Sequence, residues 1–98
     1  MSELRFSWDP RKARLNERLH GVSFEAAKTA FLDENAILLD DPDHSDREER
    51  FLLIGLCLTA RVIVISHCLR ENGTMIRIIS ARKATPTERA QYWERWKQ

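Results

Sequence analysis

The chain has 98 residues, of which 32% are charged and 43% hydrophobic, and its formal net charge at pH 7 is +1. This length suits one domain, here residues 1–98, and this balance excludes a disordered chain. The charge is uneven, because residues 33–49 contain eight acids and one arginine whereas residues 61–83 sum to +4. A nearly neutral chain with this distribution can still carry a basic patch.

The composition also bears on the compartment. Residues 1–12 are polar and charged, and no apolar run reaches the roughly 18 residues of a membrane span, so we expect neither a signal peptide nor a membrane segment. Cys57 and Cys68 sit in apolar runs, which is typical of buried free thiols rather than of disulfides. A cytoplasmic protein is therefore expected.

The first third of the chain predicts a short strand and a helical hairpin. Residues 4–8 alternate as a strand does, Asp9 and Pro10 suit a helix start, and Gly21 suits its end. Helical spacing gives this helix a narrow apolar stripe of Trp8, Lys12, Leu15 and Leu19. Ser23 can cap a second helix to about residue 32, whose inward side chains are Phe24, Ala27 and Phe31.

Strands dominate the rest of the chain. We expect a strand at 36–39, an acidic loop at 40–49, and a strand at 51–58 that is apolar on both faces and so central in the sheet. Strands 61–69 and 75–81 form a hairpin, because Asn72 and Gly73 both tolerate positive φ. Thr85-Pro86-Thr87-Glu88 is a capping box for a helix over 86–96. The order β-α-α-β-β-β-β-α predicts an α+β fold with an antiparallel sheet.

The register of the hairpin assigns its two faces. A two-residue turn pairs Arg70 with Met75, Cys68 with Arg77, and Ser66 with Ile79. One face then carries Val64, Ser66, Cys68, Arg70, Met75, Arg77 and Ile79. The other, which should meet the helical hairpin, carries Ile63, Ile65, His67, Leu69, Ile76, Ile78 and Ser80. On the more open first face Arg70 and Arg77 lie diagonally, within reach of one anion.

The charged and aromatic candidates each have two interpretations. Arg70 and Arg77 suit a phosphodiester by their forked geometry, or they pair with acids of residues 40–49. His67 lies on the apolar face, where a hydrogen-bonded core histidine is the commoner role. Trp93 and Trp96, beside Tyr92, either dock the last helix or stack on bases.

The other two histidines are expected to have no role in a site. His20 fits a structural role at a helix end. His44 lies among Asp40, Asp41, Asp43 and Asp46, but this group lacks EF-hand spacing, so no metal site is expected.

Taken together, these residues resemble the BrnT family of type II toxins, within the RelE-like ribonuclease superfamily. The most specific block is residues 77–84, Arg-Ile-Ile-Ser-Ala-Arg-Lys-Ala. The other matching residues span nearly the whole chain: Phe6, Trp8, Asp9, Lys12, Asn16, residues 20–25, Ala27, Phe31, Asp33, Glu49, Arg50, Gly55, His67, Arg70, Glu88 and Tyr92. Leu19 departs from the pattern, since the family usually has a basic residue there.

The resemblance implies a RelE-like fold and an endoribonuclease that inhibits translation. It also implies a BrnA-like antitoxin that alone contacts operator DNA, and a homodimer within that complex. The RNA 2′-hydroxyl is the nucleophile, so neither a metal nor another cofactor is expected. The catalytic candidates are Arg77, Arg70, His67 and Arg82, and the RNA-binding candidates are Arg50, Lys83 and Lys12. His67 suits a general base or acid by pKa only if a bulge or an early strand end turns it outward.

A different class of function competes with this one. The chain can be a non-catalytic RelE-like module that binds an antitoxin and acts as a transcriptional co-repressor. The near-zero net charge and the lack of a clear acid–base dyad favour that alternative, whereas the clustering of basic residues at one end of the sheet favours the ribonuclease.

Overall fold

A computed structural model describes residues 4–41 and 49–97 of the chain. It has three helices and a five-stranded sheet in the predicted order: β1 (Arg5–Ser7), α1 (Pro10–His20), α2 (Phe24–Ala30), β2 (Ile37–Asp40), β3 (Phe51–Leu56), β4 (Val62–Arg70), β5 (Met75–Lys83) and α3 (Pro86–Arg95). The α+β class is confirmed, with the strands in the order β1-β5-β4-β3-β2. β3 is an interior strand, as its apolar faces predicted. The sheet is antiparallel except for β1, which pairs in parallel with β5.

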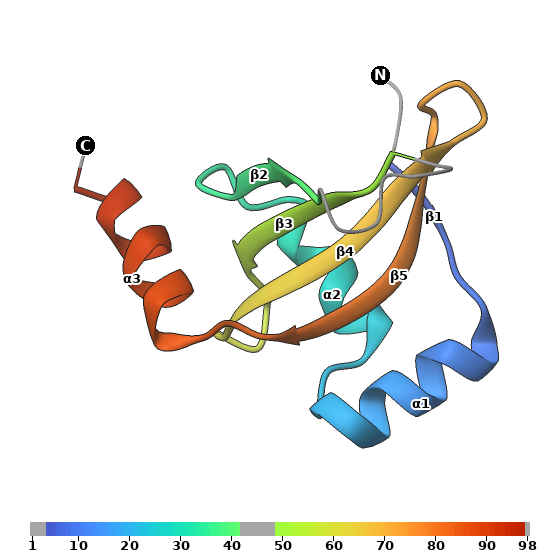
Figure 1. Ribbon diagram of the computed structural model, residues 1–98, viewed down its shortest axis with the longest axis horizontal. Helices are drawn as coiled ribbons and strands as arrows, with labels where there is room; N and C mark the ends of the chain where they lie inside the picture. Colours follow the sequence, from blue (N-terminus) through green and yellow to red (C-terminus); the bar gives the residue numbers. More distant parts are fainter. Residues whose placement is uncertain (1–3, 42–48, 98) are drawn as a thin grey trace.

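The helices cover the sheet unequally. α1 and α2 lie against one face, and α3 stands at the far end of the sheet (Figure 1). The larger core fills the space between α2 and the sheet and includes Phe24, Ala27, Ile63, Ile65 and Ile78. A smaller core of Ile54, Val62, Val64, Ala84 and Tyr92 lies on the other face, beneath α3. None of the helices described is long and apolar enough to cross a membrane.

The attachment of α1 depends on a polar residue rather than on its apolar stripe. Leu15 and Leu19 are 52% and 66% exposed, whereas Asn16 is only 6% exposed. The Asn16 amide donates to the carbonyls of Ala81 (2.8 Å) and Val22 (3.0 Å), and its oxygen accepts from the Ala81 N–H (3.0 Å). β1 pairs with β5 only over Met75–Arg77. Asn16 therefore takes the place of a neighbouring strand further along that edge.

α3 is attached by Tyr92 and by its capping box. Tyr92 is fully buried, and its hydroxyl donates to Asp33 (2.5 Å), which also accepts from the Leu56 N–H (2.8 Å). Burial and the hydrogen bond to Asp33 raise the pKa of Tyr92 to about 12. Trp93 and Trp96 stay 44% and 51% exposed, so Tyr92, and not the tryptophans, docks the helix on its own domain.

The β4–β5 hairpin matches the predicted register near the turn and departs from it further on. Arg70 pairs with Met75 and Cys68 with Arg77, joined by a four-residue loop in which Glu71, Asn72 and Gly73 all have positive φ. Ser66 pairs with Ser80 and not with Ile79, so that prediction was wrong. A β-bulge inserts Ile79 as an extra residue, and an extra residue exchanges the faces of everything beyond it.

The bulge changes which basic residues share a face. Arg82 lies opposite Val64 and Lys83 opposite Ile63. Ser80 and Arg82 therefore lie on the face of Cys68 and Arg77. The sequence had placed Ser80 on the opposite face, with Ile76 and Ile78, so that prediction was wrong. Ile79 instead lines a groove with α1 residues such as Leu15 and Leu19.

Candidate active site

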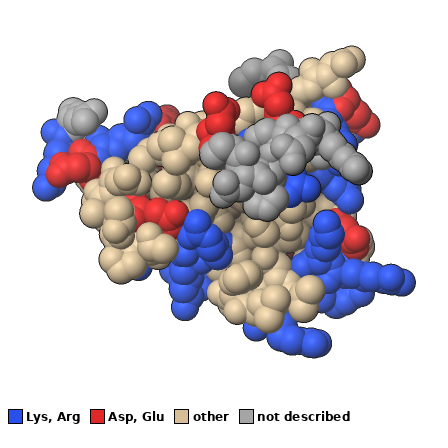
Figure 2. Space-filling model, in the orientation of Figure 1, with Lys and Arg blue, Asp and Glu red and all other residues tan. Residues whose placement is uncertain are grey.

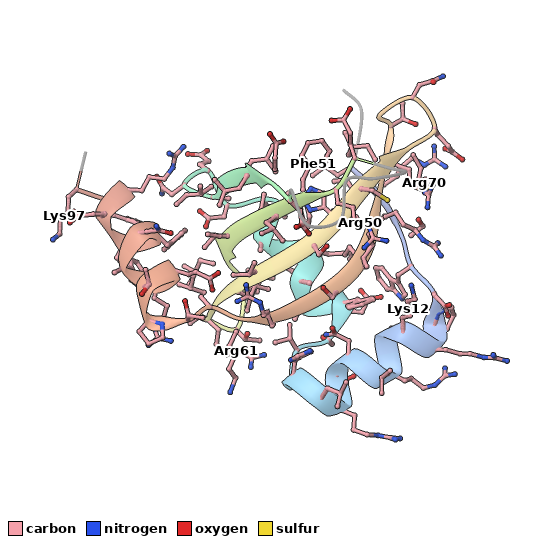
Figure 3. All side chains as sticks on the ribbon, viewed as in Figure 1. Lys12, Arg50, Phe51, Arg61, Arg70 and Lys97 are labelled. Atoms are coloured by element: carbon pink, nitrogen blue, oxygen red, sulfur yellow. The ribbon has the colours of Figure 1, made fainter. Side chains whose placement is uncertain are left out.

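Three arginines gather at one end of the sheet, on the face opposite α2. Phe51 pairs with His67 and Cys68 with Arg77, so Arg50, one residue before Phe51, stands beside Cys68 in the same row. Alternate residues of a strand point to opposite faces, which separates this row from the Phe51 and His67 rings. Arg70 lies diagonally from Arg77, and Figure 3 shows Arg50 and Arg70 near each other at this end. We call Arg50, Arg70 and Arg77 the arginine cluster.

The surroundings of the cluster suit an anion. Arg50 and Arg77 are half-buried, Arg70 is exposed, and Cys68 beneath them is only 1% exposed. The Nε of Arg50 is buried, and no described residue accepts a hydrogen bond from it. A buried donor without a partner is costly, so this N–H is suited to donate to an acceptor such as a phosphate oxygen. Figure 2 shows basic side chains gathered around this end of the sheet and along α1.

The competing interpretation of Arg70 and Arg77 involves the acids of residues 40–49. Residues 42–48, which include His44, lie outside the described residues, so this pairing stays an alternative prediction. Across 4–41 and 49–97 no three His, Cys, Asp or Glu side chains are grouped closely enough to hold a metal ion.

His67 lies in the core, away from the arginine cluster. It is 3% exposed, its ring centroid is 4.9 Å from that of Phe31 and 5.9 Å from that of Phe51, and its Nδ1 is 3.2 Å from the Ile65 carbonyl oxygen. Burial lowers the pKa of His67, which favours the neutral ring. A bulge does occur beside His67, but it leaves the ring facing α2. This placement favours the core role over acid–base chemistry.

Arg82 shares the face of Arg77 but is held by a carboxylate. Its guanidinium donates to both oxygens of Glu88, at 2.7 and 3.0 Å, and Glu88 also accepts from the Thr85 N–H at 2.8 Å. The hydrogen bonds from Arg82 lower the pKa of Glu88 to about 2. Arg82 therefore fixes the start of α3. Arg77 and Arg82 pair with Cys68 and Val64, which are four residues apart on β4, so at 3.3 Å per residue Arg82 lies about 13 Å along the sheet from Arg77.

The stability of the protein should depend on this pair at acid pH. The pKa of Glu88 falls from 4.5 to about 2, so its contribution is complete above pH 4.5 and is lost as the pH drops toward 2. We expect Glu88→Gln to cost about 1–2 kcal/mol near pH 6, since solvent around Arg82 weakens the pair. The difference in Tm between the two proteins should narrow below pH 4.5 and close near pH 2, and a difference that stays constant down to pH 2 would contradict this assignment.

The two lysine candidates line two different grooves. Lys12 is exposed on α1 and lines the groove of about 280 Å³ between α1 and β5. Lys83 is exposed at the end of β5, beside Arg61 and Arg89. Arg61 and Arg89 were not predicted as site residues, because the turn before β4 and a helix 28 residues later share no sequence pattern.

Comparison with known proteins fits this architecture. The family model described as the ribonuclease toxin BrnT of type II toxin–antitoxin systems matches residues 8–88. The chain belongs to the BrnT family. The crystal structure of the Brucella abortus ribonuclease toxin BrnT has the same fold, with a TM-score of 0.63 and 21% sequence identity over 85% of this chain and 99% of that one. No curated protein sequence matches the chain.

Several residues that carry the resemblance to BrnT toxins have structural roles here. Asn16 hydrogen-bonds to backbone groups at the edge of β5. The hydrogen bond between Tyr92 and Asp33 attaches α3 to the sheet. Glu88 caps α3 and accepts hydrogen bonds from Arg82. Arg50 and Arg77, which also carry the resemblance, share the row across buried Cys68.

Proposed function

We propose that the protein is a metal-independent endoribonuclease toxin whose arginine cluster binds the scissile phosphate. The observation that carries this proposal is the row of Arg50 and Arg77 across buried Cys68, in which the Nε of Arg50 lacks a described partner. Membership of a family of ribonuclease toxins supports RNA as the substrate. The expected consequence is inhibition of translation.

The chemistry needs charge stabilisation at phosphorus. The RNA 2′-oxygen attacks the adjacent phosphorus and loses its proton, while the bond to the 5′-oxygen breaks and that oxygen gains a proton. The products are a 2′,3′-cyclic phosphate and a 5′-hydroxyl. Negative charge grows on the non-bridging oxygens, and forked guanidiniums donate to two such oxygens at once. The row of Arg50, Cys68 and Arg77 contains neither a histidine nor a carboxylate, so its part in the reaction is electrostatic.

The partner in this proposal is a BrnA-like antitoxin. An acidic segment of such a partner is complementary to the arginine cluster and would prevent RNA from binding. Contact with operator DNA belongs to the antitoxin, and a toxin homodimer forms within the complex. The type II toxin–antitoxin description of the family supports an antitoxin as the partner.

Cleavage of RNA in the presence of EDTA tests the proposal. Purified protein should cut RNA at an unchanged rate in EDTA and leave 2′,3′-cyclic phosphate ends, and added antitoxin should stop the reaction. Cleavage that EDTA abolishes and Mg²⁺ restores would contradict metal independence. Tight antitoxin binding without any cleavage would instead support the non-catalytic co-repressor.

A further inference from the structure

A second basic pocket lies at the opposite end of the sheet, where the β3–β4 turn, the end of β5 and α3 meet. Its volume is about 250 Å³, and its lining residues are Ala60, Arg61, Val62, Lys83, Arg89 and Trp93. Arg61 precedes Arg70 by nine residues along β4, which is roughly 30 Å of extended strand. The pocket is therefore separate from the arginine cluster.

The fold explains why these side chains converge. Lys83 ends β5 opposite Ile63, and Arg61 immediately precedes β4, so both basic residues lie at this end of the hairpin. Arg89 and Trp93 are four residues apart on α3 and share one face of that helix. A hydrogen bond from the Ala84 N–H to the Val62 carbonyl (3.0 Å) holds the start of α3 against the hairpin.

Hydrogen bonds to neutral oxygens hold two of the positive charges of the pocket in place. Arg89 donates to the Ala84 carbonyl (3.0 Å) and Arg61 to the Thr59 hydroxyl (3.3 Å). Within the residues that the structure covers, no carboxylate forms an ion pair with Arg61, Lys83 or Arg89. The neighbouring acid, Glu88, is engaged by Arg82. Figure 2 shows a group of basic side chains beside the start of α3.

Trp93 adds an exposed aromatic surface to this charge. Its ring packs edge-on against Tyr92, with centroids 5.0 Å apart, and the residue remains 44% exposed. Bases stack on such surfaces whatever their sequence, while arginine and lysine bind the backbone phosphates. A pocket of about 250 Å³ is smaller than most drug-sized sites, so it suits a phosphate with one base stacked at the rim.

We propose that this pocket is a second nucleotide subsite, in which Arg61, Lys83 and Arg89 bind a phosphate of single-stranded RNA and Trp93 stacks on the adjoining base. The choice of RNA as the ligand rests on the proposed function. The subsite holds the strand at a point remote from the bond that is cut.

Binding of a labelled single-stranded DNA oligonucleotide tests this subsite separately from cleavage, because DNA lacks the 2′-hydroxyl. Fluorescence anisotropy should show about tenfold weaker binding for the double variant Arg61→Gln, Arg89→Gln. The slope of log K against log salt should become shallower by about 0.7, as expected for the loss of one phosphate contact on a single strand. Trp93→Ala should weaken binding about fivefold or more. The control Arg14→Gln, Lys28→Gln removes the same charge from α1 and α2 and should stay within twofold of the parent.

Competition experiments identify the ligand chemistry. Adenosine monophosphate should displace the oligonucleotide at a lower concentration than inorganic phosphate, and Trp93→Ala should remove that difference. Equal binding by the pocket variants and the charge control would overturn the proposal, as would pocket variants that lose only antitoxin binding. A wild-type protein that binds DNA through this pocket but does not cleave RNA would contradict the proposed nuclease and leave the subsite intact. Should Trp93→Ala not fold, the arginine variants still decide the outcome.

Discussion

Replacing Arg77 with alanine should lower the rate of RNA cleavage about 100- to 1,000-fold, which is the usual cost of removing one preorganised donor to a developing oxyanion. Arg77 is half-buried on the β5 side of the cluster, diagonal to Arg70 and directly opposite Cys68. Its loss removes a donor that is partly shielded from water and therefore stronger than a surface charge. The measurement is the initial rate of cleavage in EDTA, together with growth inhibition in cells.

Two further variants distinguish a phosphate clamp from a structural arginine. Arg77→Lys should recover only a small part of the activity, because an ammonium group cannot donate in parallel to two phosphate oxygens. Arg5→Ala on the neighbouring strand is the matched control, since Arg5 forms an exposed ion pair with Glu71 (3.1 Å) and should leave cleavage unchanged. If Arg77→Ala remains fully active but melts at a lower temperature, the arginine is structural and the proposed site is misplaced.

The largest effect on stability is expected at Asn16. Asn16→Ala removes three hydrogen bonds and leaves the Ala81 N–H and two carbonyls buried without partners. Each unsatisfied group costs about 1–3 kcal/mol, so we expect a total loss of about 3–5 kcal/mol. For a domain of this size, that corresponds to a fall in Tm of roughly 15 °C or more.

Leu15→Ala is the matched control for Asn16→Ala, because it lies on the same helix one residue earlier. Leu15 is 52% exposed, so its truncation should change the free energy of unfolding by less than about 0.5 kcal/mol. Thermal melting of the two variants decides between them. A large loss at Leu15 with a small loss at Asn16 would mean that α1 is attached by its apolar stripe after all.

Much of this fold follows from local chemistry. α1 begins after Asp9 because a carboxylate can accept hydrogen bonds from free N–H groups, and it ends at Gly21 because glycine tolerates a φ of +69°. Thr85 and Glu88 form the predicted capping box, and Asn72 and Gly73 turn the hairpin with positive φ. The diagonal of Arg70 and Arg77 follows from that turn alone. These features depend on residues close in sequence, so a single sequence is sufficient to predict them.

Other features depend on contacts between distant segments, and only the tertiary structure decided them. The bulge at Ile79 exchanges the faces of Arg82 and Lys83, and no residue pattern marks it in advance. Asn16 is buried because the edge of β5, 65 residues away, needs hydrogen-bond partners.

The two basic regions of the sheet show the same division. Arg50 joins the arginine cluster only through the pairing of β3 with β4, and Arg61 meets Arg89 and Trp93 only where α3 returns to the sheet. The sequence alone determined the order of the elements, their caps and the hairpin diagonal, because these are set by nearest neighbours. Strand register beyond the bulge, and the partners of isolated polar side chains, are set by packing across the whole chain.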